Sequence, residues 1–115
     1  MYPDKIKITQ ITMDNELKVT VEASPIFSKA SIEVENRELF GRDGTVVRSH
    51  TKVFIPDRRV MQDGVFKYMN LQKGDMIEYL KVSGRVPAAQ DQVRHPVLMV
   101  SRVGHQRAQF IELLV

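Results

Sequence analysis

Apolar and polar residues alternate along most of this chain, and this period of two restricts its fold more than any other feature. Successive side chains of a strand point to opposite faces, so alternation is typical of a strand with one buried face. It recurs over residues 5–11, 17–21, 30–34, 45–55, 76–82, 96–103 and 108–115. We therefore expect an all-β fold of about seven strands, a small antiparallel β-barrel or sandwich with long polar loops.

The connections between these segments indicate antiparallel pairing, because they are too short to hold crossover helices. Residues 13–16 are polar and predict a hairpin turn between the first two strands, and residues 104–106 predict another between the last two. A turn over residues 72–75 precedes the strand at 76–82. The inward positions are expected to be Ile6, Ile8, Leu17, Val19, Val21, Ala30, Ile32, Val34, Val47, Thr51, Val53 and Ile55.

Helical patterns are weak throughout the sequence. The best candidate is the segment 58–70, but Gly64 lies in its middle and lowers its helix propensity. We expect this segment to be irregular, or to form a short strand around residues 65–68. With 115 residues the chain has room for one domain, spanning 1–115.

The composition argues against several classes of protein. The chain has no cysteine, which removes disulfides, zinc–thiolate sites and thiol nucleophiles. No apolar run approaches the roughly 20 residues that span a bilayer, and residues 1–10 lack the apolar stretch of a signal peptide. We expect a protein that is made and kept in the cytosol, or assembled there, with no membrane partner.

Catalytic and metal-binding patterns are not found in the sequence. The histidines His50, His95 and His105 lie far apart, and none belongs to a local motif with a nucleophile. The spacings typical of zinc and calcium sites do not occur, and the glycines around residues 41–44 do not form a phosphate loop. We expect no enzyme activity, no catalytic residues, no metal and no cofactor.

The net charge of +3 is unevenly distributed. Residues 1–41 hold five Lys/Arg and seven Asp/Glu, hence −2, whereas residues 42–115 hold twelve and seven, hence +5. Such a split fits contact with nucleic acid, and it equally fits head-to-tail packing of identical subunits. A solvated surface with some scatter in its charges is the simpler interpretation.

Two long polar connections, residues 36–44 and 83–94, are candidates for functional loops, because long loops in a compact domain usually serve a function or are disordered. A cluster of basic residues can follow a phosphate backbone: Arg48, Lys52, Arg58 and Arg59. Single-strand binders stack bases on exposed aromatic rings, however, and here Phe54, Phe66, Tyr68 and Tyr79 are expected in the core, as are Met61, Met69, Met76 and Met99.

Residues 45–115 resemble a known family. The run TVVRSHTKVFIP at 45–56 is followed by LQKGDMIEYLKVSGRV at 71–86, PVLMVSRV at 96–103 and HQRAQFIELLV at 105–115. This order is similar to the head-closure (stopper) and head–tail joining proteins of tailed bacteriophages. The most telling element is Gly74-Asp75-Met76-Ile77, a Gly-Asp turn that opens a strand.

The resemblance implies a structural virion protein rather than an enzyme. It implies a small β-barrel that forms a ring, of six copies, beneath the portal and adaptor of a DNA-filled capsid. The ring would close the channel and dock the tail. Its partners would be other copies, the portal or adaptor and the tail proteins, and its location the virion, after the host cytoplasm.

Loops would carry such a function. The first candidate for the ring-contact or lumen loop is 36–44, with Arg37, Glu38, Leu39, Phe40, Arg42 and Asp43, and the second is 83–94, with Arg85, Gln90, Asp91, Gln92 and Arg94. Arg48, Lys52, Arg58 and Arg59 are the candidates for facing packaged DNA without reading its sequence. The alternative function is nucleic-acid binding by a barrel of the OB or a related kind, and a small enzyme or ligand-binding barrel ranks last.

Overall fold

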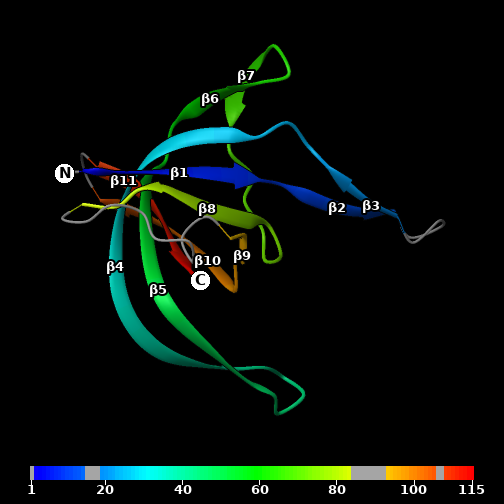
Figure 1. The fold of residues 1–115 in the computed structure, drawn as a ribbon, viewed down its shortest axis with the longest axis vertical. Coiled ribbons are helices and arrows are strands. Elements are labelled where there is room, and N and C mark those ends of the chain that lie inside the picture. Colours follow the sequence, from blue (N-terminus) through cyan, green and yellow to red (C-terminus); the bar gives the residue numbers. More distant parts are fainter. Residues whose placement is uncertain (1, 15–18, 84–92, 106–107) are drawn as a thin grey trace.

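The computed structural model describes residues 2–14, 19–83, 93–105 and 108–115, and over these residues the chain is all-β (Figure 1). The expected fold class is therefore confirmed. The strands are β1 (Asp4–Thr9), β2 (Ile11–Asp14), β3 (Val19–Glu22), β4 (Ile26–Phe40), β5 (Val46–Pro56), β6 (Arg59–Gln62), β7 (Val65–Tyr68), β8 (Met76–Lys81), β9 (His95–Pro96), β10 (Met99–His105) and β11 (Ala108–Leu114).

Seven strands form one antiparallel sheet in the order β10-β11-β5-β4-β1-β8-β9. Its two outer strands, β9 and β10, are neighbours in the chain, separated only by Val97 and Leu98. The backbone N–H of Val97 donates to the carbonyl of Asp75 before β8, and that of Leu98 donates to the carbonyl of Leu114 in β11, each at 2.8 Å. Residues 97 and 98 therefore bond to segments near the two opposite edges of the sheet, and the sheet closes into a small barrel.

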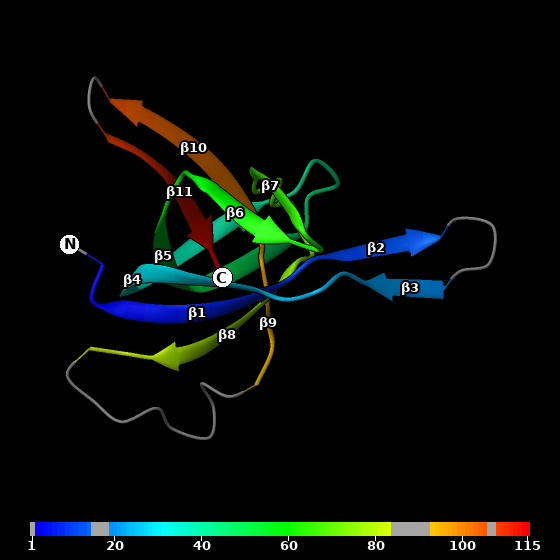
Figure 2. The same cartoon turned by 90° about the horizontal axis from the view of Figure 1, so that it is seen from above.

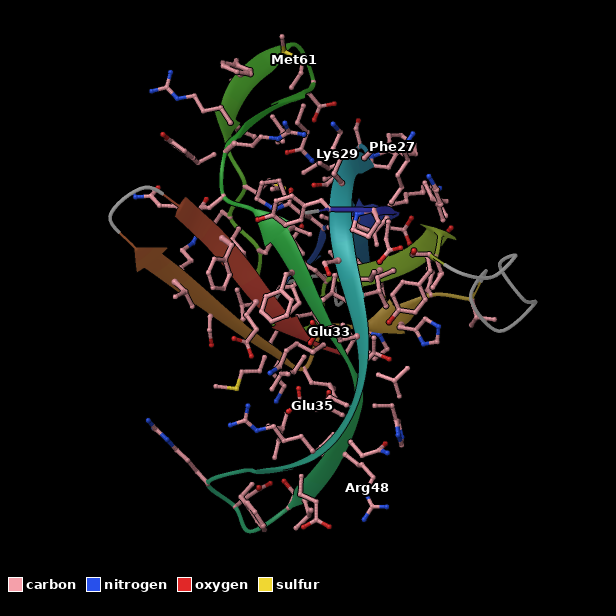
Figure 3. The ribbon with its side chains drawn as sticks, turned by 90° about the vertical axis from the view of Figure 1, so that its left-hand side faces the viewer. Phe27, Lys29, Glu33, Glu35, Arg48 and Met61 are labelled. Atoms are coloured by element: carbon pink, nitrogen blue, oxygen red, sulfur yellow. The ribbon has the colours of Figure 1, made fainter. Side chains whose placement is uncertain are left out.

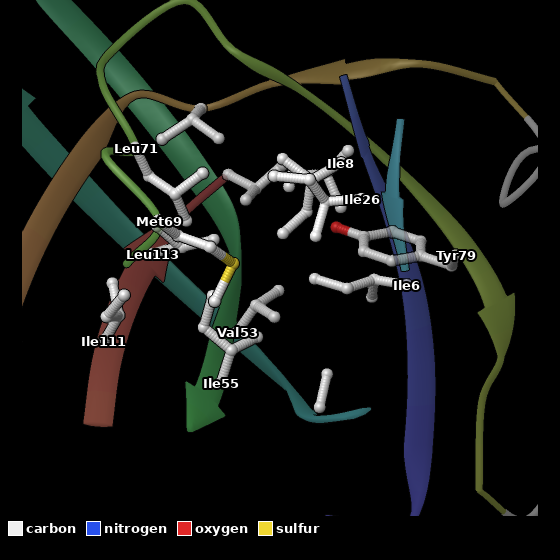
Figure 4. Packing of buried hydrophobic residues seen from close by; sticks show 14 residues of the cluster. Ile6, Ile8, Ile26, Val53, Ile55, Met69, Leu71, Tyr79, Ile111 and Leu113 are labelled. Carbon is white, nitrogen blue, oxygen red and sulfur yellow. The ribbon is translucent and has the colours of Figure 1, made fainter. Parts of the chain in front are cut away.

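The barrel interior is aliphatic (Figure 4). Its centre is formed by side chains with no exposed surface from β1, β5, β8 and β11, namely Ile6, Ile8, Val53, Ile55, Ile77, Ile111 and Leu113. The inward orientation expected for Ile6, Ile8, Val53 and Ile55 is confirmed. Met69 and Tyr79 are also buried, as predicted from their apolar neighbours.

Two buried carboxylates fasten segments that enter the barrel from distant parts of the chain. Asp75 is 3% exposed, and its Oδ1 and Oδ2 accept hydrogen bonds from the backbone N–H groups of Ile11 (3.1 Å) and Gln72 (2.9 Å). Asp4 accepts from the backbone N–H groups of Ile32 and Ser83. Asp75 of the Gly-Asp turn therefore links the start of β8 to the start of β2 through its hydrogen bond with Ile11.

Three hairpins extend outward from the barrel: β2–β3, the far half of β4–β5, and β6–β7 (Figures 1 and 2). The first corrects an expectation, because residues 5–11 were expected to pair with 17–21 as one hairpin. Instead β1 pairs with β4 and β8, while the separate strand β2 pairs with β3 and includes residues 13 and 14, which were predicted to turn. Val21, expected inside, is exposed because this hairpin lies outside the barrel.

The segment 36–44 was predicted to be a loop, and this is wrong. Its first five residues continue β4, which pairs with β5 from Arg37↔Ser49 to Phe40↔Val46, so only residues 41–45 turn. A register shift between Val34 and Arg37 marks the point where the hairpin leaves the barrel. Beyond it both faces meet solvent, which explains why alternation fades there and why Val34 and Val47 are exposed rather than inward.

The segment 58–70 is a hairpin rather than an irregular stretch. Asp63 and Gly64 both have positive φ, 51° and 76°, as the tight turns of two-residue hairpins require. The short strand expected around 65–68 is confirmed as β7. Its side chains are exposed, as is Met61 on β6, so the prediction that Phe66, Tyr68 and Met61 are core residues is wrong.

Candidate functional site

The far half of the β4–β5 hairpin, residues 34–48, is the first candidate surface, and we call it the arm. It carries the first set of predicted contact residues, with Arg37, Glu38, Leu39 and Phe40 on β4 and Arg42 and Asp43 in the turn. Several large apolar side chains are open to solvent on it, including Val34 (88% exposed) and Phe40 (75%). Such apolar exposure on a projecting element is typical of a surface that packs against another protein.

The turn of the arm is stiffened by local contacts. The hydroxyl and backbone N–H of Thr45 both donate to Asp43 Oδ1, at 2.6 and 3.1 Å, and this lowers the pKa of Asp43. A Cβ at Gly41 would lie 2.6 Å from Thr45 Oγ1 and 2.7 Å from Asp43 Oδ1, so a larger residue there would displace these two side chains. Along the strands, Arg48 forms an ion pair with Glu38 at 3.0 Å. The arm therefore presents its apolar side chains from an ordered hairpin.

The second predicted loop is described only in part. Arg85, Gln90, Asp91 and Gln92 lie outside the described residues. Arg94 is described, and its guanidinium pairs with Glu22 of β3 and with Glu78 of β8, the latter at 3.4 Å. The hydrogen bond that Arg94 donates to Glu22 lowers the pKa of the Glu22 carboxyl, and the same bond raises the pKa of the Arg94 guanidinium. Arg94 thus holds the β2–β3 hairpin to the barrel.

The four basic residues predicted to face DNA do not form one cluster. Arg48 is paired with Glu38 on the arm, and Lys52 on β5 is paired with Glu35 (2.7 Å) and Glu112 (3.5 Å). The hydrogen bond that Lys52 donates to Glu35 raises the pKa of Lys52. Because their charges are matched locally, Arg48 and Lys52 offer little net attraction to phosphate. Figure 3 shows Arg48 on the arm, at the far end of β4 from Phe27.

The other two, Arg58 and Arg59, precede and begin β6 at the opposite end of the molecule. Both are exposed, and the Arg59 guanidinium lies over the ring of Tyr68 at 5.3 Å. Neither forms an ion pair with any residue that the structure describes. They border a surface that the sequence did not predict.

Three lysines lie side by side across three strands at this end. The register places Lys29 of β4 opposite Lys5 of β1, and Lys5 opposite Lys81 of β8. All three side chains are exposed, and none has an ion-pair partner within the described part of the chain. We call them the lysine row. No local pattern reveals it, because the three residues come from distant positions in the chain.

Phe27 lies next to the lysine row, on the same strand as Lys29, and is 64% exposed. A hollow lies on each side of it, of about 830 and 320 Å³. Figure 3 shows Phe27 and Lys29 together near the start of β4, beneath Met61 of the β6–β7 hairpin. The two hollows share Phe27 and Arg58 and are otherwise lined by Lys5, Pro25, Ile26, Ile6, Ser28, Lys29, Arg59, Val60, Met61, Phe66 and Leu80. We call this surface the basic groove, since none of these lining residues is acidic.

A third hollow, of about 300 Å³, brings together two histidines that are far apart in sequence. His50 and His95 line it with Tyr79 and Val115. His50 Nδ1 lies 3.1 Å from Asn36 Oδ1, and His95 stacks on Tyr79 with ring centroids 5.1 Å apart. Among the described residues that line this hollow, none is an Asp or Glu.

Neither a metal site nor a membrane-spanning helix is found among the described residues. No group of three or more His, Cys, Asp or Glu side chains there is arranged to hold a metal ion. Within the same residues, no helix is long and apolar enough to cross a membrane.

Comparison of the chain with family models, with curated proteins and with solved structures finds no match.

Proposed function

We propose that this protein is a structural subunit of a bacteriophage neck, which forms a ring that closes the capsid portal channel and docks the tail. The arm is the observation that supports this proposal most. A two-stranded hairpin is marginally stable alone, and this one extends from a rigid barrel with Val34 and Phe40 largely exposed. Packing against another protein removes that apolar surface from water.

The placement of the projecting elements supports a ring. The arm extends from one end of the barrel and the β6–β7 hairpin from the other (Figure 1). Copies that meet through such different surfaces make head-to-tail contacts, and these close into a ring when the rotation between copies allows it. The proposed partners are further copies of the chain, a portal or adaptor protein and a tail protein, in the virion after assembly in the host cytoplasm.

Within this proposal the arm supplies the ring-contact or lumen residues. Phe40 (75% exposed) and the half-buried Leu39 provide apolar contact area, and Arg37, Glu38, Arg42 and Asp43 are exposed charged residues of the same hairpin. An apolar centre within a polar rim is the usual composition of a protein interface.

The experiment begins with the gene neighbourhood and the purified particle. We expect the gene to lie among portal, capsid and tail genes, and the protein to be present in purified virions. A gene outside any phage or prophage, or a virion that lacks the protein, overturns the proposal.

A substitution then tests the arm. We expect Phe40→Asp to yield capsids that lose DNA and lack tails in electron micrographs of infected-cell lysates. Val21→Asp is the matched control, because Val21 is also an exposed apolar residue on a projecting hairpin, at 52% exposure. Equal particle yields from both variants would remove the arm from the proposed interface.

A further inference from the structure

The lysine row is a feature that folding alone does not explain. Neighbouring strands lie about 4.8 Å apart. Lys29 and Lys5 are a cross-strand pair of like charge, and so are Lys5 and Lys81, next to a register shift between β1 and β8. Like charges directly opposite each other destabilise a sheet. No carboxylate of the described residues pairs with them. Other exposed cations, such as Lys67 and Lys73, also lack a described acidic partner, but they are not placed directly opposite another cation as these three lysines are. An anion bound from outside would supply the counter-charge that the described residues do not.

The basic groove adds flat apolar surface to these charges. Phe27 and Arg58 line both hollows of the groove. Phe66 lines the larger hollow, and its side chain is 60% exposed. Solvent-exposed phenylalanine rings beside unpaired cations match the arrangement by which proteins hold single strands. There the cations follow the phosphates and the aromatic rings stack on unpaired bases.

We propose that the basic groove binds single-stranded nucleic acid without sequence specificity. Phosphates contact the lysine row and Arg58, and bases stack on Phe27 and Phe66. A nucleic acid supplies a negative charge and a flat ring at every residue, so it matches both components of the lining. An acidic peptide supplies the charge alone. A duplex presents its phosphates but keeps its base faces stacked, so it cannot use the two rings.

This inference does not depend on the proposed neck function. The groove is at the opposite end of β4 from the arm, and none of the arm's proposed contact residues lines it (Figure 3). It shares the β6–β7 hairpin with the second surface of the proposed ring, but its charge and its exposed rings are present whether or not a ring forms. The sequence predicted that the aromatic rings are buried and cannot stack on bases. In the structure Phe66 and Tyr68 are exposed, so this argument against nucleic-acid binding does not hold for them.

The test measures binding of the full-length protein to a fluorescein-labelled 20-nucleotide oligo(dT) by fluorescence anisotropy at several salt concentrations. Contact by four cations (Lys5, Lys29, Lys81 and Arg58) predicts a slope of about −3 in log K against log salt, since each contributes about −0.7 on single strands. Affinity should then fall about 50-fold between 50 and 200 mM salt. A 20-base-pair duplex should bind more weakly than the single strand.

Two groove variants separate charge from stacking. Lys29→Gln combined with Arg58→Gln removes two cations, so the salt slope should fall to about half. Phe27→Ala should weaken binding about 5- to 100-fold and leave the slope unchanged, because it removes a stacking platform and no charge. All three side chains are exposed, and thermal melting of each variant checks that the barrel is intact.

The matched control is Arg42→Gln combined with Arg48→Gln, which removes the same charge from the arm. We expect its affinity to stay within twofold of the unmodified protein. The proposal is overturned if the unmodified protein does not bind oligo(dT), if the arm control loses as much affinity as the groove variant, or if the duplex binds as tightly as the single strand. Groove variants that keep oligo(dT) affinity but lose a protein contact would instead assign the groove to a protein partner.

Discussion

Replacement of Asp75 by alanine tests how much the hydrogen bonds of its buried carboxylate stabilise the barrel. The Asp75 carboxylate is 3% exposed and accepts two backbone hydrogen bonds, from Ile11 at 3.1 Å and from Gln72 at 2.9 Å. Alanine removes the acceptor of both N–H groups, and each of these hydrogen bonds is partly buried. Ile11 and Gln72 are 64 and 3 residues away in sequence, so the first of these bonds holds together parts of the chain that no local structure connects.

The magnitude follows from the two bonds. A hydrogen bond to a charged group contributes about 1.5–3 kcal/mol, so the loss of both lowers the free energy of unfolding by about 3–6 kcal/mol. A domain of this size has about 5–15 kcal/mol in total, so the variant stays folded unless the protein lies at the bottom of that range. At about 4 °C for each kcal/mol, the melting temperature should fall by 12 °C or more. Asp75→Asn keeps one acceptor oxygen and should lose about half as much.

The assay is thermal and urea unfolding followed by circular dichroism at pH 7. Asp43→Ala is the control, because Asp43 also accepts two hydrogen bonds but does so in an exposed turn, where water replaces them. Its melting temperature should change much less. If Asp75→Ala melts within about 3 °C of the unmodified protein, or if the two variants are equally affected, the buried carboxylate is not the tie described above.

Three further substitutions have directions set by single contacts. Arg94→Gln should lower the free energy of unfolding at pH 7, because Arg94 holds the folded-state pKa of Glu22 below its ordinary value of 4.5. In acid-unfolding experiments the difference from the unmodified protein should disappear as the pH falls through that depressed pKa. Gly64→Ala should lower the free energy of urea unfolding by about 1 kcal/mol, because alanine is strained at its φ of 76°. Lys29→Glu should raise stability by about 0.2–1 kcal/mol in the same assay, because it replaces repulsion of Lys5 by attraction, while it weakens oligo(dT) binding.

Alternation predicted the barrel wherever a strand has one face inside. Ile6 and Ile8, and likewise Val53 and Ile55, are fully buried at the positions that the pattern assigned to the core. The pattern failed where a strand leaves the barrel, since it reports which residues share a face and not whether anything covers that face. Val34 continues the alternation of β4 but lies beyond the last residues that the barrel encloses.

The β6–β7 hairpin was missed although its signal is present in the sequence. Asp63-Gly64 lies between two stretches of apolar and polar residues, and this dipeptide strongly favours a two-residue hairpin turn. Gly64 was instead interpreted as a weakness in a helix. Once the turn is recognised, Phe66 and Tyr68 belong to a hairpin too short to form a core of its own, which explains their exposure.

The basic groove could not be predicted from a single sequence. Lys5, Lys29 and Lys81 become neighbours only through the pairing of β1 with both β4 and β8, and alternation does not determine which strands pair. The basic residues that the sequence predicted to face DNA are close together in the chain. Two of them, Arg48 and Lys52, form ion pairs with Glu38 and Glu35. Clustering of charge along the chain is therefore a poor guide to clustering on a surface built from distant strands.

The arm and the lysine row share one property, which is that neither stabilises the isolated chain. Buried aliphatic side chains and the hydrogen bonds of Asp4 and Asp75 stabilise the barrel. The arm extends beyond the barrel, and the lysine row has its side chains exposed on the barrel's strands. Like-charge pairs cost about 0.2–1 kcal/mol each, which is small beside the 3–6 kcal/mol assigned to the Asp75 bonds, so the fold tolerates them. Exposed Phe40 and unpaired Lys5 are better explained by molecules that cover them, and the two surfaces differ enough in chemistry to require different partners: an apolar protein face for the arm and a polyanion for the groove.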